Sequence, residues 1–408
     1  MQPVRHSVPP LVAEEPVSTP APAAQDPSTL RDRFLVPIGA FLASNLVLWG
    51  VARGIGMEYF DARVWVKWDA SYYLSIARRG YTFFSCGVDR HLADMYGAHQ
   101  WCGNAGWFPG YPAMVRVVEQ LGLSGPTAGV LVSTIFQLAI LVFVWNAFLI
   151  SRSSFDRVLG VLLAAFFFGS VYYRAVFPIA MTAFFILLSL WYLNRERWVP
   201  AGLAGFAAAF CYPTGFVLAG VQGAWILWHG SRTRWKQRGY RLLATSGLTV
   251  AGLGAVMVFQ KATTGVWGAF FKVQARYGYG GFHNPLHKLV KTVRPVFSGG
   301  LSVREASNWQ TLVVAVFMVS LLASVGLRLR RGEHVEKIEQ LALITALAFW
   351  LFPLIVGQQV HLYRAEALLL PAVLAFHRVP KAGQMVFLWV ALWLAVNMAL
   401  LFYRGVLV

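Results

Sequence analysis

One carboxylate in this chain stands out by its setting. Asp69 lies in the aromatic run of residues 64–81, just after the first membrane-length apolar stretch, residues 34–52. In one interpretation it caps a short amphipathic helix, predicted over Ala70–Arg79 and ended by Gly80. In the other it is a general base at the water–lipid boundary, within reach of a lipid-linked substrate. Both interpretations stay open on this evidence, and both can hold at once.

The composition defines the class of protein. Hydrophobic residues make up 57% of the 408 residues and charged residues only 13%. Several apolar runs reach the roughly 20 residues that a helix needs to span a bilayer. The formal net charge is +18, but the basic residues lie in short clusters between these runs. Basic clusters between spans are typical of signals that orient a protein in the membrane, and they argue against a nucleic-acid partner. The sequence therefore predicts an all-α polytopic membrane protein.

The apolar pattern predicts a short tail followed by one membrane domain. Residues 1–30, rich in Pro, Ala and Ser, are expected to form a disordered cytoplasmic tail, and residues 31–408 the membrane domain. The first span is expected to be a retained signal anchor in a bacterial plasma membrane. The basic clusters fall on one side of the membrane when eleven helices cross it. These are expected over residues 34–52, 126–150, 157–171, 178–194, 199–211, 214–229, 241–260, 311–327, 338–356, 362–376 and 385–403.

Two long segments lie on the outer side in this topology. The first, residues 53–125, carries Asp69 and an amphipathic piece, residues 107–116, that suits a helix lying in the interface. A full crossing by residues 107–121 is the alternative, but it would move basic clusters outside. The second, residues 261–310, has seven Lys or Arg residues against one acid. This excess favours an anionic partner, either lipid headgroups or a phosphate-bearing substrate.

The cysteines support an oxidising exterior, and nothing in the sequence predicts a cofactor. Cys86 and Cys102 both fall in the first outer segment, where they can form a disulfide. The chain has no closely spaced Cys and His set of the zinc type, so no metal site is predicted. It also has no phosphate-binding loop, dinucleotide fingerprint or nucleophile elbow. No acidic cluster supports a divalent cation.

Elimination among the acids favours Asp69. The chain has only 17 Asp and Glu residues, and the two between Gln120 and Arg304, Asp156 and Glu196, would be cytoplasmic. Of the outer acids, only Asp61 and Asp69 lie near the first span in an aromatic setting. The outer set comprises Glu58, Asp61, Asp69, Asp89, Asp94, Glu119, Glu305 and Glu366.

Residues 68–81 (WDASYYLSIARRGY) and residues 107–112 (WFPGYP) resemble a family signature, W-D-x-x-W/H-Y-x-x-I-A-x-x-G-Y followed by F-F-P-x-Y-P. It belongs to bacterial proteins similar to the second mannosyltransferase of glycosylphosphatidylinositol synthesis, the PIG-V-like members of the GT-C glycosyltransferase class. Residues 212–216 (YPTGF) and 265–274 (GVWGAFFKVQ) are similar to two further family elements, as is Tyr363-Arg364 with Pro371.

The sequence also departs from the family. Residues 179–183 (IAMTA) lack the acid of the family's Y-x-E-S element. Tyr212 replaces an arginine, and Tyr363-Arg364 reverses the usual order. These departures bear on the sugar and acceptor rather than on the fold.

The resemblance implies a GT-C fold and transfer of a hexose, in this family mannose, from a polyprenyl-phosphate sugar to a lipid or glycan acceptor on the outer, periplasmic face. Asp69 would take the proton of the acceptor hydroxyl, which displaces the lipid phosphate with inversion. Arg364, Arg276 and Lys272 are the candidate partners of that phosphate, with Gln274 as a hydrogen-bond partner.

Five aromatic residues would line the sugar and lipid sites, or else anchor the protein in the interface: Trp68, Tyr72, Tyr73, Trp107 and Tyr111. Two other classes of function compete with transfer. A flippase or transporter of lipid-linked saccharides would place ionisable residues along a midplane path, often with repeated halves, and no repeat is visible. In a non-catalytic subunit of a glycan-assembly complex, Asp69 would serve only as a helix cap.

Overall fold

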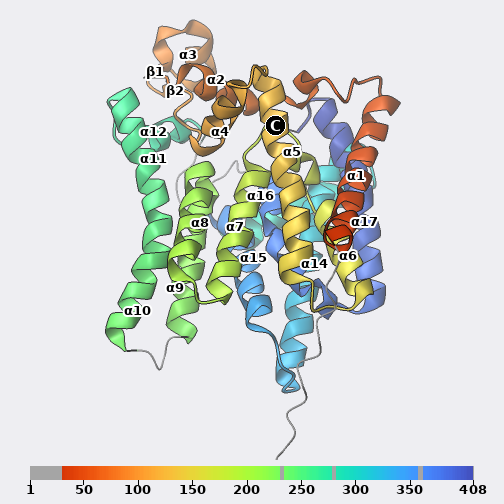
Figure 1. Ribbon diagram of the computed structural model, residues 1–408. Coiled ribbons are helices and arrows are strands. Elements are labelled where there is room, and N and C mark those ends of the chain that lie inside the picture. Colours follow the sequence, from red (N-terminus) through yellow and green to blue (C-terminus); the bar gives the residue numbers. More distant parts are fainter. Residues whose placement is uncertain (1–29, 230–233, 278–281, 357–361, 408) are drawn as a thin grey trace, which may run out of the picture.

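The computed structural model describes residues 30–229, 234–277, 282–356 and 362–407. Figure 1 shows a bundle of helices with a small lobe at one end, formed around α2, α3, α4, β1 and β2. The tail expected over residues 1–30 lies outside the described residues, apart from Leu30, where α1 begins.

Six of the described helical segments are long and apolar enough to cross a membrane, which makes the chain an integral membrane protein. They are Arg33–Gly54, Gly125–Phe148, Trp235–Thr264, Val303–Arg330, Lys337–Ile355 and Lys381–Tyr403. The first segment lies within α1 (Leu30–Gly54). The others are, in order, α5 (Gly125–Phe143) with η3 (Val144–Phe148), α10 (Trp235–Leu242) with η6 (Leu243–Gly247) and α11 (Leu248–Thr264), η7 (Val303–Glu305) with α14 (Ala306–Arg330), α15 (Lys337–Ile355) and α17 (Lys381–Tyr403).

The expected count of eleven spans is not confirmed. The other five expected segments are helical but shorter: α6 (Ser154–Ala165), α7 (Ile179–Asn194), α8 (Trp198–Cys211), η5 (Pro213–Phe216) with α9 (Val217–His229), and α16 (Leu362–Glu366) with η8 (Ala367–Arg378). The helix α7 shows why hydropathy alone does not decide the count. It packs against α5, α8, α15 and η8, and its apolar side chains are therefore buried in protein as well as suited to lipid.

The lobe comprises residues 55–124, between α1 and α5. Its elements are η1 (Ala62–Trp65), α2 (Ala70–Arg79), β1 (Phe83–Ser85), η2 (Cys86–Val88), α3 (Arg90–Tyr96), β2 (Trp101–Gly103) and α4 (Gly110–Glu119). The strands β1 and β2 pair antiparallel, and a disulfide joins Cys86 to Cys102. The helix α4 has ten residues, about 15 Å at 1.5 Å per residue, so the alternative in which it crosses the membrane is wrong.

The second outer segment also begins at the lobe end of the bundle. After α11, the chain forms α12 (Ala269–Ala275), which lies beside the lobe in Figure 1, and later α13 (Pro285–Gly299). The connection between α8 and α9 is a sharp break, as the sequence predicts. A Cβ atom on Gly215 would lie 2.2 Å from the carbonyl oxygen of Ala208, so the turn requires glycine there.

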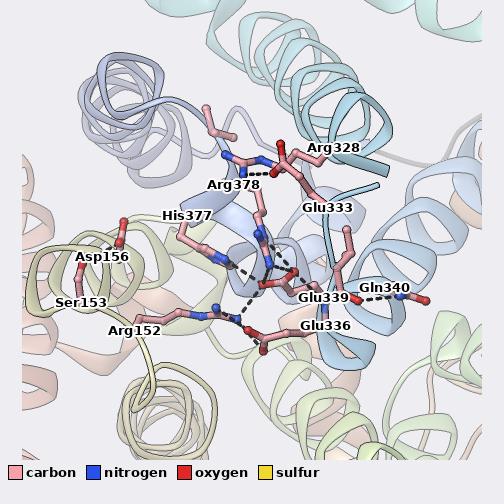
Figure 2. A network of polar contacts seen from close by, with 12 residues as sticks. Arg152, Ser153, Asp156, Arg328, Glu333, Glu336, Glu339, Gln340, His377 and Arg378 are labelled. Atoms are coloured by element: carbon pink, nitrogen blue, oxygen red, sulfur yellow. Dashed lines mark hydrogen bonds and ion pairs between the residues drawn. The ribbon is translucent and has the colours of Figure 1, made fainter. Parts of the chain in front are cut away.

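A network of ion pairs lies at the end of the bundle opposite the lobe, where α5 ends (Figure 2). Glu339 is fully buried and lies 2.7 Å from Arg152, 2.8 Å from Arg378 and 2.9 Å from His377. Arg152 also pairs with Glu336 at 2.8 Å. The network ties the chain after η3 to the start of α15 and the end of η8. It thereby anchors the segment α16–η8, whose other end reaches the lobe.

Candidate functional site

The local structure around Asp69 separates the two interpretations of this residue. The helix α2 spans Ala70–Arg79 and ends at Gly80, whose φ of 77° suits glycine, as predicted. Asp69 itself has helical backbone angles, and its side chain makes no capping hydrogen bond to the described residues. The capping interpretation is therefore wrong, and the carboxylate is free to serve another partner.

That partner is Arg364, in α16. Its Nη1 atom donates to Oδ2 of Asp69 at 2.5 Å, across 295 positions of sequence. The side chains are 12% exposed for Arg364 and 26% exposed for Asp69. We refer to this contact as the site ion pair. A charge-assisted hydrogen bond of this kind is stronger than a neutral one, and partial exposure leaves it open to substrates.

Aromatic side chains surround the site ion pair. The ring of Phe177 lies 5.7 Å from the guanidinium carbon of Arg364. Burial raises the pKa of Tyr73 well above its usual value, and the charge of Asp69 adds to this rise. Burial also raises the pKa of Tyr212, although Arg364 opposes the change. Both phenols are therefore neutral hydroxyl groups beside the ion pair.

The backbone just before the carboxylate is strained. Trp68 has a φ of 46°, in the left-handed region that residues with a side chain rarely adopt. Its ring is 51% exposed, so burial of the side chain does not explain the conformation. Strain of this kind persists where the surrounding structure imposes it, and it gathers at functional sites. The strained turn sets the direction in which α2 begins, and with it the position of Asp69.

One turn along α2, an aromatic pair forms a flat wall. Tyr72 stacks on Trp107 with ring centroids 3.7 Å apart and planes 14° from parallel. The hydroxyl of Tyr81 donates to the carbonyl oxygen of Trp107 at 2.7 Å, which holds the backbone of that residue. Because Tyr72 follows Asp69 by three positions in a helix, the wall lies on the same side of α2 as the carboxylate.

Two glutamines, one near the end of α11 and one in the second outer segment, hold the loop that carries this wall. The side-chain amide of Gln260 donates to the carbonyl oxygen of Ala105 at 2.7 Å, and that of Gln274 to the carbonyl oxygen of Gly106 at 2.6 Å. A Cβ atom on Gly106 would lie 2.9 Å from the Gln274 amide nitrogen, so a larger residue there would displace this side chain. Gln274, expected as a ligand group, thus engages the lobe backbone.

Two of the expected phosphate partners lie against the lobe. Lys272 lies over the ring of Trp101 at 5.5 Å. Arg276 lies over the rings of Tyr96 and Tyr277 at 4.6 and 4.7 Å, and it donates to the Tyr277 hydroxyl at 2.7 Å. Among the described residues, neither cation makes an ion pair with a carboxylate. The structure thus brings Arg364, but neither of these two, to the carboxylate of Asp69.

Tyr111 packs between the lobe and α5 and does not line the site. Its side chain is fully buried, and its hydroxyl lies 2.8 Å from the carbonyl oxygen of Gly129 and 2.9 Å from the hydroxyl of Ser133, both in α5. Its ring contacts that of Tyr73 edge to face. Tyr111 therefore joins the lobe to the membrane helix beneath it.

Sequence reasoning missed three residues of this region: Tyr212, Gln260 and Phe177. Tyr212 lies in the YPTGF motif, and this position could have marked it as a site residue. Gln260 could have been noticed as a polar residue at the end of an apolar span. Phe177 lies in an apolar stretch, and nothing in the sequence distinguishes it from its neighbours. In the part of the chain that the structure describes, no group of three or more His, Cys, Asp or Glu side chains could hold a metal ion.

No protein-family model matches this chain, and no curated protein matches it. Solved structures of the oligosaccharyltransferase AglB from Archaeoglobus fulgidus are similar at 12% identity over 91% of the chain. The TM-scores are 0.47 for the apo form, 0.48 for the form tethered with an acceptor peptide, and 0.48 for the complex with an inhibitory peptide and a dolichol-phosphate. This chain covers 55–56% of the archaeal chains. A likeness of this degree carries no argument about activity, which therefore rests on the residues of the site.

Proposed function

We propose that this protein is a membrane glycosyltransferase of the GT-C class. It transfers a hexose, with mannose as the first candidate, from a polyprenyl-phosphate sugar to a lipid or glycan acceptor, on the outer face of the membrane. The observation that carries the proposal is the position of Asp69. It follows a strained turn, serves no cap among the described residues and meets an arginine at the lobe end of the membrane helices.

The site ion pair suggests how the substrate activates the base. Arg364 neutralises Asp69 before substrate binds. A lipid phosphate offers the guanidinium a second anion, with oxygens that match its planar fork. When the phosphate takes over this contact, the carboxylate of Asp69 is released to the acceptor. Substrate binding and activation of the base are then one event.

The transfer step follows from the same two residues. The acceptor hydroxyl gives its proton to Asp69 as its oxygen forms a bond to the anomeric carbon. The bond between that carbon and the phosphate oxygen breaks, and its electron pair stays on the leaving phosphate. Arg364 stabilises the growing negative charge. Attack opposite to the leaving group inverts the configuration of the sugar.

The aromatic residues complete the proposed site. Tyr72 and Trp107 form a flat surface on which a sugar ring can stack, and the exposed ring of Trp68 contacts lipid or substrate. Tyr73 offers a neutral hydroxyl beside the carboxylate. Tyr111 acts through packing, and the neutral amide of Gln274 holds the lobe backbone. The charges of Lys272 and Arg276 attract the anionic donor, as part of a second outer segment with seven Lys or Arg residues against one acid.

The test is sugar transfer by purified protein from polyprenyl-phosphate mannose to a lipid acceptor. Asp69→Asn keeps the shape of the side chain but removes its basicity, so turnover should fall about 100-fold or more. Asp61→Asn is the matched control, because Asp61 is a nearby carboxylate that pairs with Arg63 at the surface. Its turnover should change little.

Each alternative predicts a different result. Near-normal turnover by a well-folded Asp69→Asn protein would contradict the base mechanism. A flippase would move lipid-linked sugar across vesicles without forming product. A non-catalytic subunit would do neither, with any sugar donor tested.

A further inference from the structure

A second arginine, Arg174, lies inside the bundle and has no acidic partner in the part of the chain that the structure describes. It follows η4 (Ser170–Tyr173), in the connection between α6 and α7. Its guanidinium lies over the rings of Tyr59 at 4.5 Å and Trp65 at 5.2 Å. Its Nη1 atom donates to Oδ1 of Asn45 at 3.0 Å. All of these partners are neutral.

The charge of Arg174 is therefore unbalanced. Among the described residues, no carboxylate lies within ion-pair distance of it. Burial raises the pKa of Tyr59 to about 12, although Arg174 opposes the rise, so this phenol does not supply a negative charge near neutral pH. The hydroxyl of Tyr403 donates to a backbone carbonyl and is likewise neutral. A cation removed from water without a counter-ion is unfavourable, and rings compensate it only in part.

The surroundings of Arg174 form a polar cluster between two membrane helices. Asn45 in α1 lies 3.5 Å from Gln137 in α5, and Gln137 lies 3.5 Å from Ser44. All three side chains are at least nine-tenths buried. Thr134 of α5 accepts a further bond from Arg174 at 3.4 Å. Buried polar groups in membrane-spanning helices are unfavourable, and they are typical of sites that bind a ligand or ion.

One edge of the guanidinium makes no hydrogen bond to the described residues. The Nη1 atom makes both hydrogen bonds, to Asn45 and Thr134. The Nε atom is buried and has no hydrogen-bond partner among the described residues. The Nε and Nη2 atoms together form an edge with two parallel N–H groups. That is the edge with which arginine binds two oxygens of one phosphate.

We propose that Arg174 is a second anion site, which binds the phosphate group of an amphiphilic lipid. The site lies between membrane-spanning helices, so its ligand must carry the negative charge on an apolar chain. Two sources share this chemistry, a polyprenyl phosphate and an anionic phospholipid of the membrane. The residues that contact Arg174 do not include Asp69 or Arg364, and occupancy of the site does not depend on glycosyl transfer.

The test is native mass spectrometry of the full-length protein, titrated in detergent with three lipids. A polyprenyl monophosphate and phosphatidylglycerol represent the two sources, and dioleoylglycerol is the matched lipid without phosphate. Arg174→Gln should weaken binding of the phosphate lipid about tenfold or more, on the scale of one charge-assisted contact. Arg63→Gln is the control, because Arg63 is 84% exposed and already paired with Asp61.

A second variant keeps the arginine and supplies an internal counter-ion. Asn45→Asp has nearly the same shape and places a carboxylate against Nη1 of Arg174, where the amide oxygen now lies at 3.0 Å. It should also weaken binding of the phosphate lipid about tenfold, because the site is then already neutral. This variant decides the question even if Arg174→Gln does not fold.

The outcomes separate the two sources from a purely structural role. Preference for the polyprenyl monophosphate identifies the lipid of the proposed donor, and equal binding of phosphatidylglycerol identifies a general anionic-lipid site. The proposal is overturned if Asn45→Asp binds phosphate lipids as tightly as the wild type. It is also overturned if the wild type binds them no better than dioleoylglycerol. Arg174 would then be a structural cation held by Tyr59 and Trp65.

Discussion

The site ion pair allows the stability and the activity of this protein to be measured separately. We consider three variants: Asp69→Asn, Arg364→Gln, and the two together. Asp69→Asn leaves a cation that is 12% exposed among aromatic rings, whereas Arg364→Gln leaves a carboxylate that is 26% exposed. The first should therefore destabilise the protein more than the second. In the double variant neither charge remains, so its loss of stability should be smaller than the sum of the two single losses.

The magnitude follows from the distance and the exposure. Two unit charges about 4 Å apart attract each other by about 4 kcal/mol at an effective dielectric constant of about 20. Water reaches this pair, so the loss should lie below the roughly 3–5 kcal/mol of fully buried pairs and above the roughly 1 kcal/mol of exposed ones. We expect about 2 kcal/mol for Asp69→Asn, about 1 kcal/mol for Arg364→Gln and a coupling of about 1 kcal/mol between them.

The assay is unfolding in mixed micelles titrated with sodium dodecyl sulfate, followed by circular dichroism. Sugar transfer is measured on the same preparations. The double variant should lose about 2 kcal/mol, less than the roughly 3 kcal/mol of additive losses. Its transfer should stay at background, because the base and the phosphate partner are both lost. Strictly additive losses of stability would refute the ion pair as an energetic unit. Recovery of transfer in the double variant would refute the catalytic assignment of both residues.

Two further predictions concern the two ends of the bundle. Replacing Cys86 and Cys102 by serine opens a loop with a sequence separation of 16 and should destabilise the lobe by about 3 kcal/mol; hydrogen exchange should rise in the lobe and not in the membrane helices. Glu339→Gln removes the buried carboxylate that pairs with Arg152, His377 and Arg378 (Figure 2) and should reduce the free energy of unfolding by about 3–5 kcal/mol. Glu336→Gln, at a side chain that is 41% exposed, should cost under about 1 kcal/mol. Equal losses for these two carboxylates in the unfolding titration would contradict the assignment of Glu339 as the centre of the network.

Local features of this protein were predictable from the sequence because they depend on neighbouring residues. The helix over Ala70–Arg79 and its end at Gly80 follow from a short amphipathic pattern and a residue that tolerates positive φ. The break after α8 follows from the turn residues around Gly215. Asp69 was found by composition, since so few acids lie near the first span in a chain with 17 in total.

The number of spans could not be obtained in this way. Hydropathy reports that a side chain avoids water but does not say whether it is buried by lipid or by protein. The helix α7 is apolar and packed on several sides by other helices, and it looks like a span in the sequence. The roles of Gln274 and Tyr111 could not be predicted from the sequence for a similar reason. A polar atom on an aromatic or amide side chain is free or engaged depending on which backbone reaches it, as the carbonyl of Gly106 reaches Gln274.

The sequence by itself determined a helical membrane protein with a candidate base, Asp69, placed between the first span and an amphipathic helix. Only the tertiary structure decided which cation that carboxylate meets. Arg364 is 295 positions away, and the sequence offered it only as a candidate for the lipid phosphate, beside Arg276 and Lys272. The distance between two charges depends on how the whole bundle packs, from the anchored end of η8 to the lobe. A local pattern of residue types does not contain that information.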